Sequence, residues 1–408
     1  MQVQVVASMS ELISVAEAEA LVARHMPSFG SERVALDDAA GRILRESIRA
    51  ERDQPPFDRV MMDGIAIAAD GSGRRRFRCG GLQLAGMAQL GLDDAGGCIE
   101  VATGAMLPRG CDTVVPVEQT RRDGAYCVLA DGHLPAAGQF VHRRGADCRE
   151  GDVLLEPGMR LAGPAMAVLA ANGVATVEVS IAPSITIVAT GDELAEVGQP
   201  LREGQIRGSN DRALAATLRA GGFGDVQRIR VADDLAAITA TLAGLLQTRQ
   251  VLVLSGGVSV GQRDYVPEAL RSLGVRQVLH RIAQRPGRPM WFGIGPRGQA
   301  VFALPGNPVS VLVCAVRYLL PALQSACGLA AAPPVQVCLE RALDASASLT
   351  FFVPVRVHHD PAGRAMAVPL PTGTSGDFSA LPRTHGFVEV PAGSASTPAG
   401  TVAVFHRW

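Results

Sequence analysis

Between residues 183 and 330, short apolar runs alternate with longer segments whose apolar positions recur every three to four residues. The short runs are typical of buried strands, and the longer segments are typical of helices that bury one face. This alternation predicts a parallel sheet with helices on both faces, which is a three-layer, doubly wound α/β domain. We expect strands at SITIVA, VQRIRV, VLVL and AVFAL, and helices at DRALAATLRAGG, LAAITATLAGLL, YVPEALRSLG and from Pro308 to about Ala326.

The segments that precede residue 183 have other patterns. Residues 14–26 predict a helix, and Ser14 followed by Glu17 predicts a capping box at its start. Residues 50–149 contain short β-like runs (CIEVA, DTVVPVE, AYCVL) cut by Gly, Pro and Asp, which predict a mostly β insertion domain. Residues 150–182 contain a helical stretch, AMAVLAANG, and a strand-like VATVEVSIA. We therefore expect residues 1–49 and 150–182 to form one split, helical linking domain.

After residue 331 the helical patterns stop. The runs VQVCL, FFVPVRVHH, AMAVPL, GFVEV and TVAVFH are short strands punctuated by Pro and Gly. They predict that residues 331–408 form a small C-terminal β-barrel, with a sandwich as the alternative. The 183–330 segment is then a domain between the linking domain and this barrel.

Composition narrows the class of protein. The chain has 408 residues, 48% hydrophobic and 19% charged, so it is globular and long enough for several domains. Its formal net charge of −1 gives no overall field that would attract nucleic acid or an anionic membrane. All 38 basic residues are arginine. The start, MQVQVVASMSEL, does not have the pattern of a signal peptide, and no uncharged apolar run is long enough to cross a bilayer, so we expect a soluble cytoplasmic protein.

The cysteines give no local metal or disulfide signature. They form no C-x-x-C motif and no Cys/His cluster along the sequence, so we interpret them as buried, reduced thiols. The eight are Cys79, Cys98, Cys111, Cys127, Cys148, Cys314, Cys327 and Cys338.

Three of the predicted strands end in loops with chemistry suited to an anion. Ligands of doubly wound sheets bind beyond the carboxyl ends of the strands, and glycines there let backbone N–H groups approach a phosphate. In the third loop, Asn307 is placed to cap a helix that begins at Pro308. Each loop alone is better explained as a tight turn, but three at adjacent strand ends of one sheet favour a shared site. The loop residues are Thr190, Gly191 and Glu193 in the first, Ser255, Gly256, Gly257, Ser259 and Gly261 in the second, and Pro305, Gly306, Asn307 and Ser310 in the third.

Two further groups are candidates for charge chemistry. Arg285 and Arg288, on a Pro-Gly turn, suit a dianion through charge-assisted hydrogen bonds, although a solvated turn is an equal alternative. In the insertion domain, Asp63, Thr103 and Asp147 suit a hydrated Mg²⁺, with turn capping as the alternative for each carboxylate. Asp264 begins a helix, where a purely capping role is the alternative.

In their order along the chain these segments resemble the molybdopterin molybdenumtransferase family, which includes MoeA and the gephyrin E domain. The resemblance spans residues 55 to about 390, and the pair SGGVSVG and LPGNPVS is its most specific part. The matching motifs are PPFDRVMMDG, ATGAMLPRGCDTVVPVE, RRGAD, ATGDEL, SGGVSVGQRDY, RPGRP, LPGNPVS and TSGDFSAL.

The resemblance implies a reaction and an assembly. Adenylylated molybdopterin and molybdate would react with Mg²⁺ to give molybdenum cofactor and AMP. The 183–330 segment would be the molybdopterin-binding domain. The active cleft would lie between the α/β domain and C-terminal barrel of one subunit of a homodimer and the insertion domain of the other. It also implies contact with the molybdopterin adenylyltransferase, and no binding of nucleic acid or membrane.

The resemblance further implies roles for single residues. Asp63, Thr103, Asp147, Glu193 and Asp264 would surround ligand and metal, with Asp63 and Glu193 on the metal and the four carboxylates catalytic. Arg285, Arg288, Ser310 and Ser375 would bind molybdate, and the other glycine-loop residues would bind molybdopterin.

Several positions depart from the family pattern. Arginines replace the usual lysines at 285 and 288, Arg59-Val60 replaces Asn-Ser, and Gly208 replaces an Asp. Leu349 and Pro354, which flank Phe352, stand where the family often has arginines. These substitutions remove family residues from the proposed anion and metal sites. A non-catalytic carrier or chaperone of the same fold is therefore the alternative function. An unrelated nucleotide-binding enzyme would require G-x-G-x-x-G or a Walker lysine, and the chain has neither.

Overall fold

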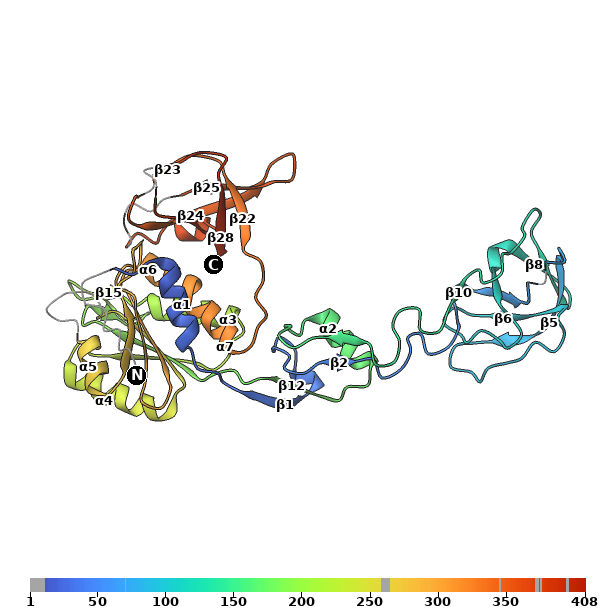
Figure 1. Cartoon of the computed structure of the whole chain (residues 1–408), viewed down its shortest axis with the longest axis horizontal. Helices are drawn as coiled ribbons and strands as arrows, with labels where there is room; N and C mark the ends of the chain where they lie inside the picture. The colour runs from blue at the N-terminus through green and yellow to red at the C-terminus, as the bar shows by residue number, and fades with distance from the viewer. Residues whose placement is uncertain are drawn as a thin grey trace, which may run out of the picture.

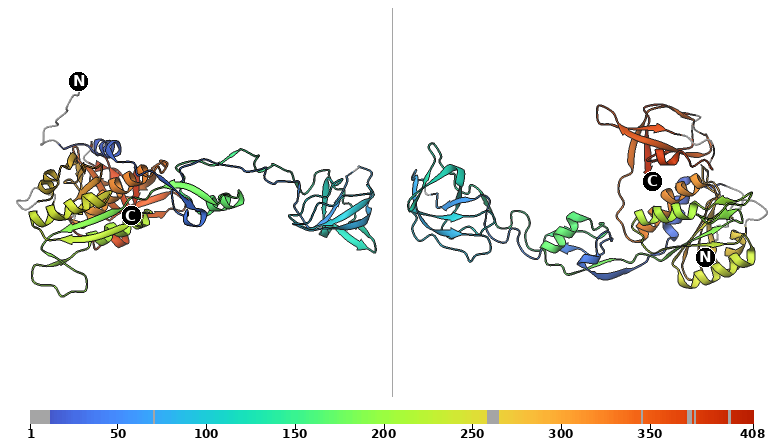
Figure 2. Two further views of the ribbon diagram at one scale, coloured as in Figure 1. Left: turned by 90° about the horizontal axis from the view of Figure 1, so that it is seen from below. Right: turned by 180° about the vertical axis from the view of Figure 1, so that it is seen from behind.

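The computed structural model describes residues 12–69, 71–257, 265–344, 346–370, 374, 376–393 and 396–408. The chain is elongated, with the α/β domain and the C-terminal barrel at one end and the insertion domain at the other (Figure 1). The linking domain lies between them, and the views from below and from behind show the same separation (Figure 2). The multidomain architecture expected from the sequence is confirmed.

The α/β domain is built on a six-stranded sheet in the order β16-β13-β17-β21-β20-β18. The first four strands are parallel and are the four expected from the apolar runs. The sequence patterns missed β18 and β20, which pair antiparallel at one edge, because β18 has a single buried residue and forms no apolar run. The strands are β13 (Ile185–Thr190), β16 (Val226–Val231), β17 (Val251–Ser255), β18 (Arg276–His280), β20 (Trp291–Ile294) and β21 (Ala300–Leu304).

Helices cover both faces of this sheet because alternate strand residues point to opposite sides. Val253 lies in the same core as residues of α3 and α6, whereas its neighbours Leu252 and Leu254 lie in the core that α4 and α5 cover. The three-layer arrangement is thus confirmed. The helices are α3 (Asn210–Ala220), α4 (Leu235–Thr248), α5 (Val266–Ser272) and α6 (Pro308–Cys314).

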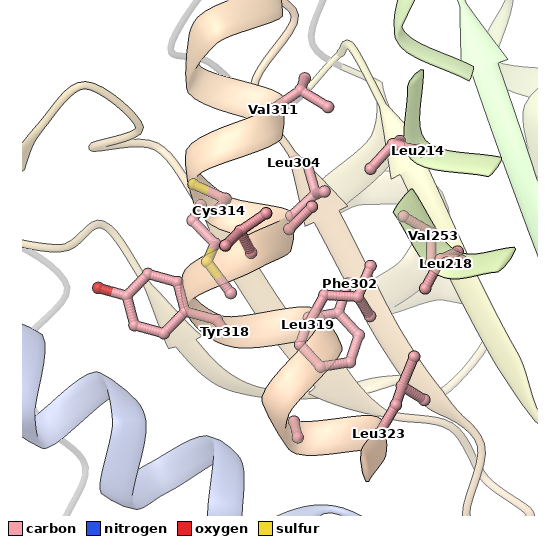
Figure 3. Close-up of a cluster of buried hydrophobic side chains, with 14 of the residues drawn as sticks. Leu214, Leu218, Val253, Phe302, Leu304, Val311, Cys314, Tyr318, Leu319 and Leu323 are labelled. Atoms are coloured by element: carbon pink, nitrogen blue, oxygen red, sulfur yellow. The ribbon is translucent and has the colours of Figure 1, made fainter. Parts of the chain in front are cut away.

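The larger of the two cores is shown in Figure 3. Leu214 and Leu218 of α3 lie on one side of it, opposite Leu319 and Leu323 of the long helix, and all four are fully buried. Phe302 of β21 lies between them. Val309 near the start of α6 and Leu304 at the end of β21 belong to the same core, so the start of α6 packs with the carboxyl end of that strand.

The helix expected from Pro308 to about Ala326 is present. It consists of α6, a π-helical turn at Ala315–Leu319 and α7 (Leu320–Ala326). By length and composition alone it is apolar enough to cross a membrane, and it is the one such helix among the described residues. About three fifths of it (61%) is buried inside the protein, as expected of a core helix.

The N-terminal helix α1 (Val15–His25) has the predicted capping box. Glu17 N–H donates to the Ser14 hydroxyl oxygen at 3.2 Å, and Ser14 N–H donates to the Glu17 carboxylate at 2.8 Å. Val15, Ala18 and Val22 bury their side chains in the larger core of the α/β domain. The helix itself therefore lies outside the linking domain.

The linking domain joins the two ends of the molecule through two strand pairs and one helix. β1 (Ser31–Ala35) pairs antiparallel with β12 (Thr176–Ser180), so segments far apart in the sequence do come together here. A small core containing Leu44, Leu161 and Leu169 holds them. The remaining elements are η1 (Leu36–Asp38), β2 (Ile48–Arg49), β11 (Val153–Leu155) and α2 (Gly163–Ala171).

The insertion domain is a six-stranded sheet in the order β7-β4-β6-β5-β9-β8, with apolar clusters on both faces. A separate strand pair, β3 with β10, packs Val60 and Val141 into one of these clusters. The mostly β composition is confirmed. The elements are β3 (Arg59–Val60), β4 (Gly64–Ile67), β5 (Arg76–Gln83), β6 (Gly97–Val101), β7 (Thr113–Pro116), η2 (Val117–Gln119), β8 (Thr120–Asp123), β9 (Tyr126–Leu129) and β10 (Val141–His142).

The C-terminal domain is a closed five-stranded barrel, not a sandwich. Its strands follow the order β24-β25-β22-β28-β26, and β26 pairs back with β24. A short strand of the α/β domain, β19, pairs parallel with β24 and attaches the barrel. The strands are β19 (Gln284–Arg285), β22 (Val335–Leu339), β24 (Thr350–His359), β25 (Ala365–Pro369), β26 (Gly386–Val390) and β28 (Val402–Arg407). Short elements outside these sheets are β14 (Leu194–Ala195), β15 (Ile206–Arg207), β23 (Leu343–Asp344), η4 (Leu381–Arg383) and β27 (Ser396–Thr397).

Candidate functional site

The three glycine-containing loops expected to share a site leave neighbouring strands. β13, β17 and β21 are adjacent in the sheet, and the register places Ala189 beside Ser255 and Ser255 beside Leu304. The loops also touch, since Gly256 N–H donates to the carbonyl oxygen of Leu304 at 3.3 Å. They converge at the carboxyl edge of the sheet, where doubly wound domains bind their ligands.

Gly256 and Gly257 are glycines because the chain turns tightly over Thr190. Their φ angles are 99° and 67°, in the region that favours glycine. A Cβ on Gly256 would lie 2.8 Å from the carbonyl oxygen of Thr190, and one on Gly257 would lie 2.9 Å from Cγ2 of Val266. Any side chain at either position would push the second loop away from the first.

Thr190 lies beneath this turn with an unusual hydroxyl. The residue is 4% exposed, and its Oγ1 atom has no hydrogen-bond partner among the described residues. A buried hydroxyl without a partner costs about 1–3 kcal/mol, so such groups usually have a partner in the functional state. The hydroxyl would lie 3.2 Å from a Cβ at either glycine, so it faces the second loop.

Asn210 joins two of the loops, and the sequence patterns missed it. Its side-chain N–H group donates to the Ser255 hydroxyl oxygen at 3.1 Å and to the Gly306 carbonyl oxygen at 2.7 Å. The residue is the first of α3, one position before the helix predicted at DRALAATLRAGG. A polar residue at the start of the helix that follows β13 was the available signal.

The third loop leads into the long helix as expected. Asn307 occupies the N-cap position of α6 and Pro308 is the first helical residue, although the Asn307 side chain makes no capping hydrogen bond. Pro305 and Ser310 are buried, whereas Gly306 and Asn307 are exposed. The first turn of the helix therefore faces the same edge as the glycine loops.

The turn that carries Arg285 and Arg288 packs against this helix. Gly287 has φ 93°, and a Cβ there would lie 2.6 Å from both the Cys314 sulfur and the Gln284 side-chain nitrogen. That nitrogen donates to the Pro286 carbonyl oxygen at 3.0 Å. The turn is therefore held by a buried polar contact, while both arginine side chains are exposed.

The barrel positions without arginine lie next to this turn and on the outer face of β24, on the same side as Phe352. Leu349 is half-buried and immediately precedes Thr350, whose register partner is Gln284. Pro354 is buried on β24 and faces Phe387 of β26. Phe352, between them, is buried in the larger α/β core.

Glu193 extends the first loop. Its carboxylate folds back over Gly191, since a Cβ on that glycine would lie 2.7 Å from Oε1 of Glu193. The side chain is exposed, and no hydrogen bond to its carboxylate is found among the described residues. Its neighbour Asp192 instead accepts a hydrogen bond from Asp233 N–H at 3.2 Å.

In the insertion domain Asp63 and Thr103 form one polar unit. Thr103 donates both its N–H and its hydroxyl to Oδ1 of Asp63. These two bonds, the backbone one first, hold the pKa of Asp63 below its usual range. Oδ2 accepts no hydrogen bond from the described residues, and the residue is exposed. The carboxylate is thus oriented by one oxygen and open at the other.

The neighbouring carboxylate of Asp58 has a different role. Arg143 donates to its Oδ2 at 2.6 Å and Arg144 N–H donates to its Oδ1 at 2.9 Å. Partial burial raises the pKa of Asp58, but these two partners outweigh it and lower the pKa overall. With both oxygens engaged, Asp58 holds the 143–144 loop and is not available to a metal.

Asp147 is the end of a chain of three polar side chains. Arg59 donates to Nδ1 of His142 at 3.0 Å, and Nε2 of His142 lies 2.8 Å from Oδ1 of Asp147. Because a guanidinium can only donate, Nδ1 is the acceptor and Nε2 carries the proton toward Asp147. His142 pairs with Arg59 across β10 and β3, and Gly104 N–H donates to Val60 of β3. Asp147 and the Asp63–Thr103 unit therefore share one small region.

Two separate groups of candidate residues result. One contains the glycine loops, Glu193 and the arginine turn, and the other contains Asp63, Thr103 and Asp147. They lie at opposite ends of the elongated chain, so a single chain does not bring them together (Figure 1). Ser259, Gly261, Asp264 and Ser375 lie outside the described residues.

The cysteines add no nucleophile to either group. All eight are free thiols. Burial raises the pKa of Cys111 and of Cys314 to about 12, so neither is a thiolate near neutral pH.

Comparisons with known proteins cover nearly the whole chain. Family models match at residues 13–173 (MoeA N-terminal region, domain I and II), 186–325 (probable molybdopterin binding domain) and 336–408 (MoeA C-terminal region, domain IV). A molybdopterin molybdenumtransferase of Synechocystis sp. is 40% identical over 97% of this chain and 100% of its own length. One of Bacillus subtilis is 29% identical over 95% of this chain and 92% of its own. The crystal structure of a molybdopterin biosynthesis MoeA protein from Pyrococcus horikoshii OT3 has a TM-score of 0.82 at 27% identity, covering 98% of this chain and 100% of that one.

Proposed function

Because the chain belongs to the molybdopterin molybdenumtransferase (MoeA) family, we propose that it inserts molybdate into adenylylated molybdopterin, forming molybdenum cofactor and AMP. The observation that carries the proposal is the convergence of three loops at one edge of the sheet, where the buried Thr190 hydroxyl has no partner among the described residues. An anionic, phosphate-bearing ligand suits this edge, since glycine backbone N–H groups and a helix start face it.

Molybdate would bind beside this ligand. It is a small dianion, and the exposed guanidinium groups of Arg285 and Arg288 and the hydroxyl of Ser310 are suitable donors. Ser375 would complete the group. The soft metal ligands would come from the dithiolene of molybdopterin, since molybdenum in this chemistry requires sulfur and each candidate group has a lone cysteine beside it, Cys314 or Cys148, and no cysteine cluster.

Mg²⁺ fits Asp63 and Glu193. Each offers a carboxylate oxygen that is exposed and not hydrogen-bonded by the described residues, which is the donor set that Mg²⁺ prefers. When bound, the ion would polarise the phosphoanhydride whose cleavage releases AMP. Thr103 orients Asp63, and His142 orients Asp147 toward the same region, with Asp264 as the remaining candidate carboxylate.

A homodimer would unite the two groups of residues. Since one chain holds them at opposite ends, the α/β and barrel end of one subunit would meet the insertion domain of its partner (Figure 1). A cytoplasmic location and contact with the molybdopterin adenylyltransferase belong to the same proposal.

The test is release of AMP. Purified full-length protein is incubated with adenylylated molybdopterin and molybdate, with and without Mg²⁺, and AMP and molybdenum cofactor are quantified. We expect both products only when molybdate and Mg²⁺ are present. Tight binding of molybdopterin without any AMP release would instead support the carrier function, which the loss of arginine at Leu349 and Pro354 left open.

A further inference from the structure

Three cysteines that are far apart in the sequence meet in the insertion domain. Cys79, Cys98 and Cys127 lie on the adjacent strands β5, β6 and β9, and their sulfur atoms are all within 4.8 Å of one another. The Cys79 sulfur is 3.1 Å from that of Cys127 and 3.6 Å from that of Cys98. All three side chains lie on one face of the sheet, in or against the cluster that contains Phe77.

A carboxylate and a cation complete the group. Oε1 of Glu100 lies 3.5 Å from the Cys79 sulfur, and Glu100 follows Cys98 by two positions on β6, so it points to the same face. Arg122 of β8 forms an ion pair with Glu100 and places its Nη1 atom 2.7 Å from the Cys79 sulfur. Three sulfurs thus form one group, and a carboxylate and a guanidinium contact it at Cys79.

The spacing matches a tetrahedral zinc site. Zinc binds thiolates at about 2.3 Å and carboxylate oxygens at about 2.0–2.2 Å, so the edges of the tetrahedron are roughly 3.5–3.8 Å long. The distances from the Cys79 sulfur to Cys98 and to Glu100 fall in this range, and the one to Cys127 is about 0.7 Å shorter than a sulfur–sulfur edge. Glu100 is not in the group whose atoms are all within 4.8 Å, so its half-exposed side chain would turn toward the ion. Three thiolates and a carboxylate leave an excess of negative charge on a bound Zn²⁺, which Arg122 would offset.

A disulfide explains the group less well. Cys127 pairs in register with Phe77, so Cys79 is its diagonal neighbour on the antiparallel strand. Diagonal neighbours have Cα atoms about 7–8 Å apart, beyond the usual range of a disulfide. Cys79 and Cys98 are direct register partners, and are therefore the pair that a disulfide would join. A disulfide would also use two of the three sulfurs and leave the third, with Glu100 and Arg122, without a role.

We propose that Cys79, Cys98, Cys127 and Glu100 form a structural Zn²⁺ site that braces the insertion domain. The site would tie together β5, β6 and β9, and β6 ends two residues before Thr103. It would therefore support the position of the Asp63–Thr103 unit. This site is separate from the Mg²⁺ and molybdate chemistry, and its test does not depend on that activity.

The test uses the full-length protein after reduction and removal of metal. The probes are Zn²⁺, measured as metal bound per chain, and Co²⁺, whose bonds to thiolates give an intense charge-transfer absorption in the near ultraviolet. We expect one equivalent of either metal, the charge-transfer band with Co²⁺, and a higher melting temperature with Zn²⁺. Cys79→Ser, at a half-buried position, should fold and lose the bound metal, and Glu100→Gln should bind it more weakly.

Cys338→Ser is the matched control, since Cys338 is a half-buried thiol on the C-terminal barrel and should keep the bound metal. Wild-type protein that binds no more Zn²⁺ than Cys79→Ser, or binds Co²⁺ without a thiolate band, would overturn the proposal. Unchanged affinity in Glu100→Gln would contradict the assignment of the fourth ligand.

Discussion

Thr103 donates both its backbone N–H and its hydroxyl to a single oxygen of Asp63, at 2.6 and 2.8 Å. The other oxygen of the carboxylate is therefore fixed in direction and left open. Because Thr103 is reached through β6 and Asp63 directly precedes β4, the two neighbouring strands set this geometry. An oriented, ionised carboxylate of this kind is what a metal-dependent step requires.

Asp63→Asn should lower turnover far more than it weakens binding of molybdopterin. The amide keeps the shape but loses the charge proposed to hold Mg²⁺, so the rate should fall on the order of 10²-fold. AMP release and ligand titration measure the two effects separately. Asp131→Asn, an exposed carboxylate in the same domain, is the control and should be silent. A near wild-type rate in Asp63→Asn would remove this residue from the mechanism.

Thr103→Val should change the pH dependence of the same step. The two Thr103 hydrogen bonds lower the pKa of Asp63, so losing the hydroxyl should raise that pKa toward its usual value. A depressed pKa keeps the carboxylate ionised as pH falls. The acid limb of the activity profile should therefore move to higher pH in the variant, with little change near neutral pH. An unchanged acid limb would mean that Asp63 does not titrate in this step.

Mixed dimers test whether the site is shared between subunits. Asp63→Asn and Glu193→Gln should each be nearly inactive as homodimers. In a dimer with one chain of each kind, one site combines the unchanged Glu193 end of one chain with the unchanged Asp63 end of the other. Random mixing by co-expression should restore roughly a quarter of wild-type activity, because half of the dimers are mixed and half of their sites are intact. No recovery would contradict a shared site, as would full activity of a monomer in light scattering.

The sequence predicted most elements that position this site. The apolar runs located β13, β17 and β21, and the strand-end rule then placed Thr190, Ser255 and Pro305 at one edge. Asn210 was missed because a polar residue at a helix start usually caps or solvates that helix, and its partners come from distant loops. The cysteine group was missed for a similar reason, since strand pairing, not spacing along the chain, brings its members together.

The separation of the two groups of residues also could not be derived from local pattern. It depends on the linking domain, whose β1 and β12 pair across more than a hundred residues of intervening sequence. The antiparallel strand β18 was missed because few of its residues are buried, and its partner β20 is only four residues long. In each case the feature depends on contacts between residues far apart in the sequence, and local hydrophobic periodicity does not predict such contacts.

An ion pair between Arg317 and Glu389 fastens the barrel to the long helix. Arg317 Nε lies 2.9 Å from Glu389, and both side chains are largely buried, 11% and 18% exposed. Burial raises the pKa of Glu389, but the hydrogen bond from His406 and the charge of Arg317 outweigh it, so the pKa lies below its usual value. Glu389→Gln should destabilise the protein by about 1–3 kcal/mol, because Arg317 keeps only its more exposed partner Glu19, and His406 loses its charged partner.

The pH dependence of this contribution has a definite sign. A carboxyl whose pKa is depressed in the folded state stabilises the protein at pH values above its unfolded-state pKa of about 4.3. This contribution is lost as the pH falls through the folded-state pKa. The free energy of unfolding, measured with denaturant, should therefore fall more on acidification for wild-type protein than for Glu389→Gln. Glu340→Gln, which alters a more exposed pair with His358, is the control. Equal acid sensitivity of Glu389→Gln and wild type would contradict this account.

Arg288→Ala tests the proposed molybdate group most directly. The turn should survive the substitution, since its backbone is held by the bond from Ile282 N–H to the Arg288 carbonyl and by the contacts of Gly287 with α6. Loss of one charge-assisted contact to a dianion costs about 1.5–3 kcal/mol, so the molybdate requirement should rise roughly tenfold to a hundredfold. Binding of molybdopterin should hardly change. Arg288→Lys should rescue in part, because lysine restores the charge but not the planar fork.

Arg271→Ala, an exposed arginine on α5, is the matched control and should leave the molybdate requirement unchanged. If Arg288→Ala behaves like this control while the fold is intact, the arginine turn is a solvated surface feature. The barrel then offers no substitute, because the neighbouring positions where the family often has arginines are Leu349, half-buried, and Pro354, buried. If Arg285→Ala is silent as well, neither place supplies a cation for molybdate. The same fold would then bind the cofactor without inserting the metal, and the carrier function would be preferred.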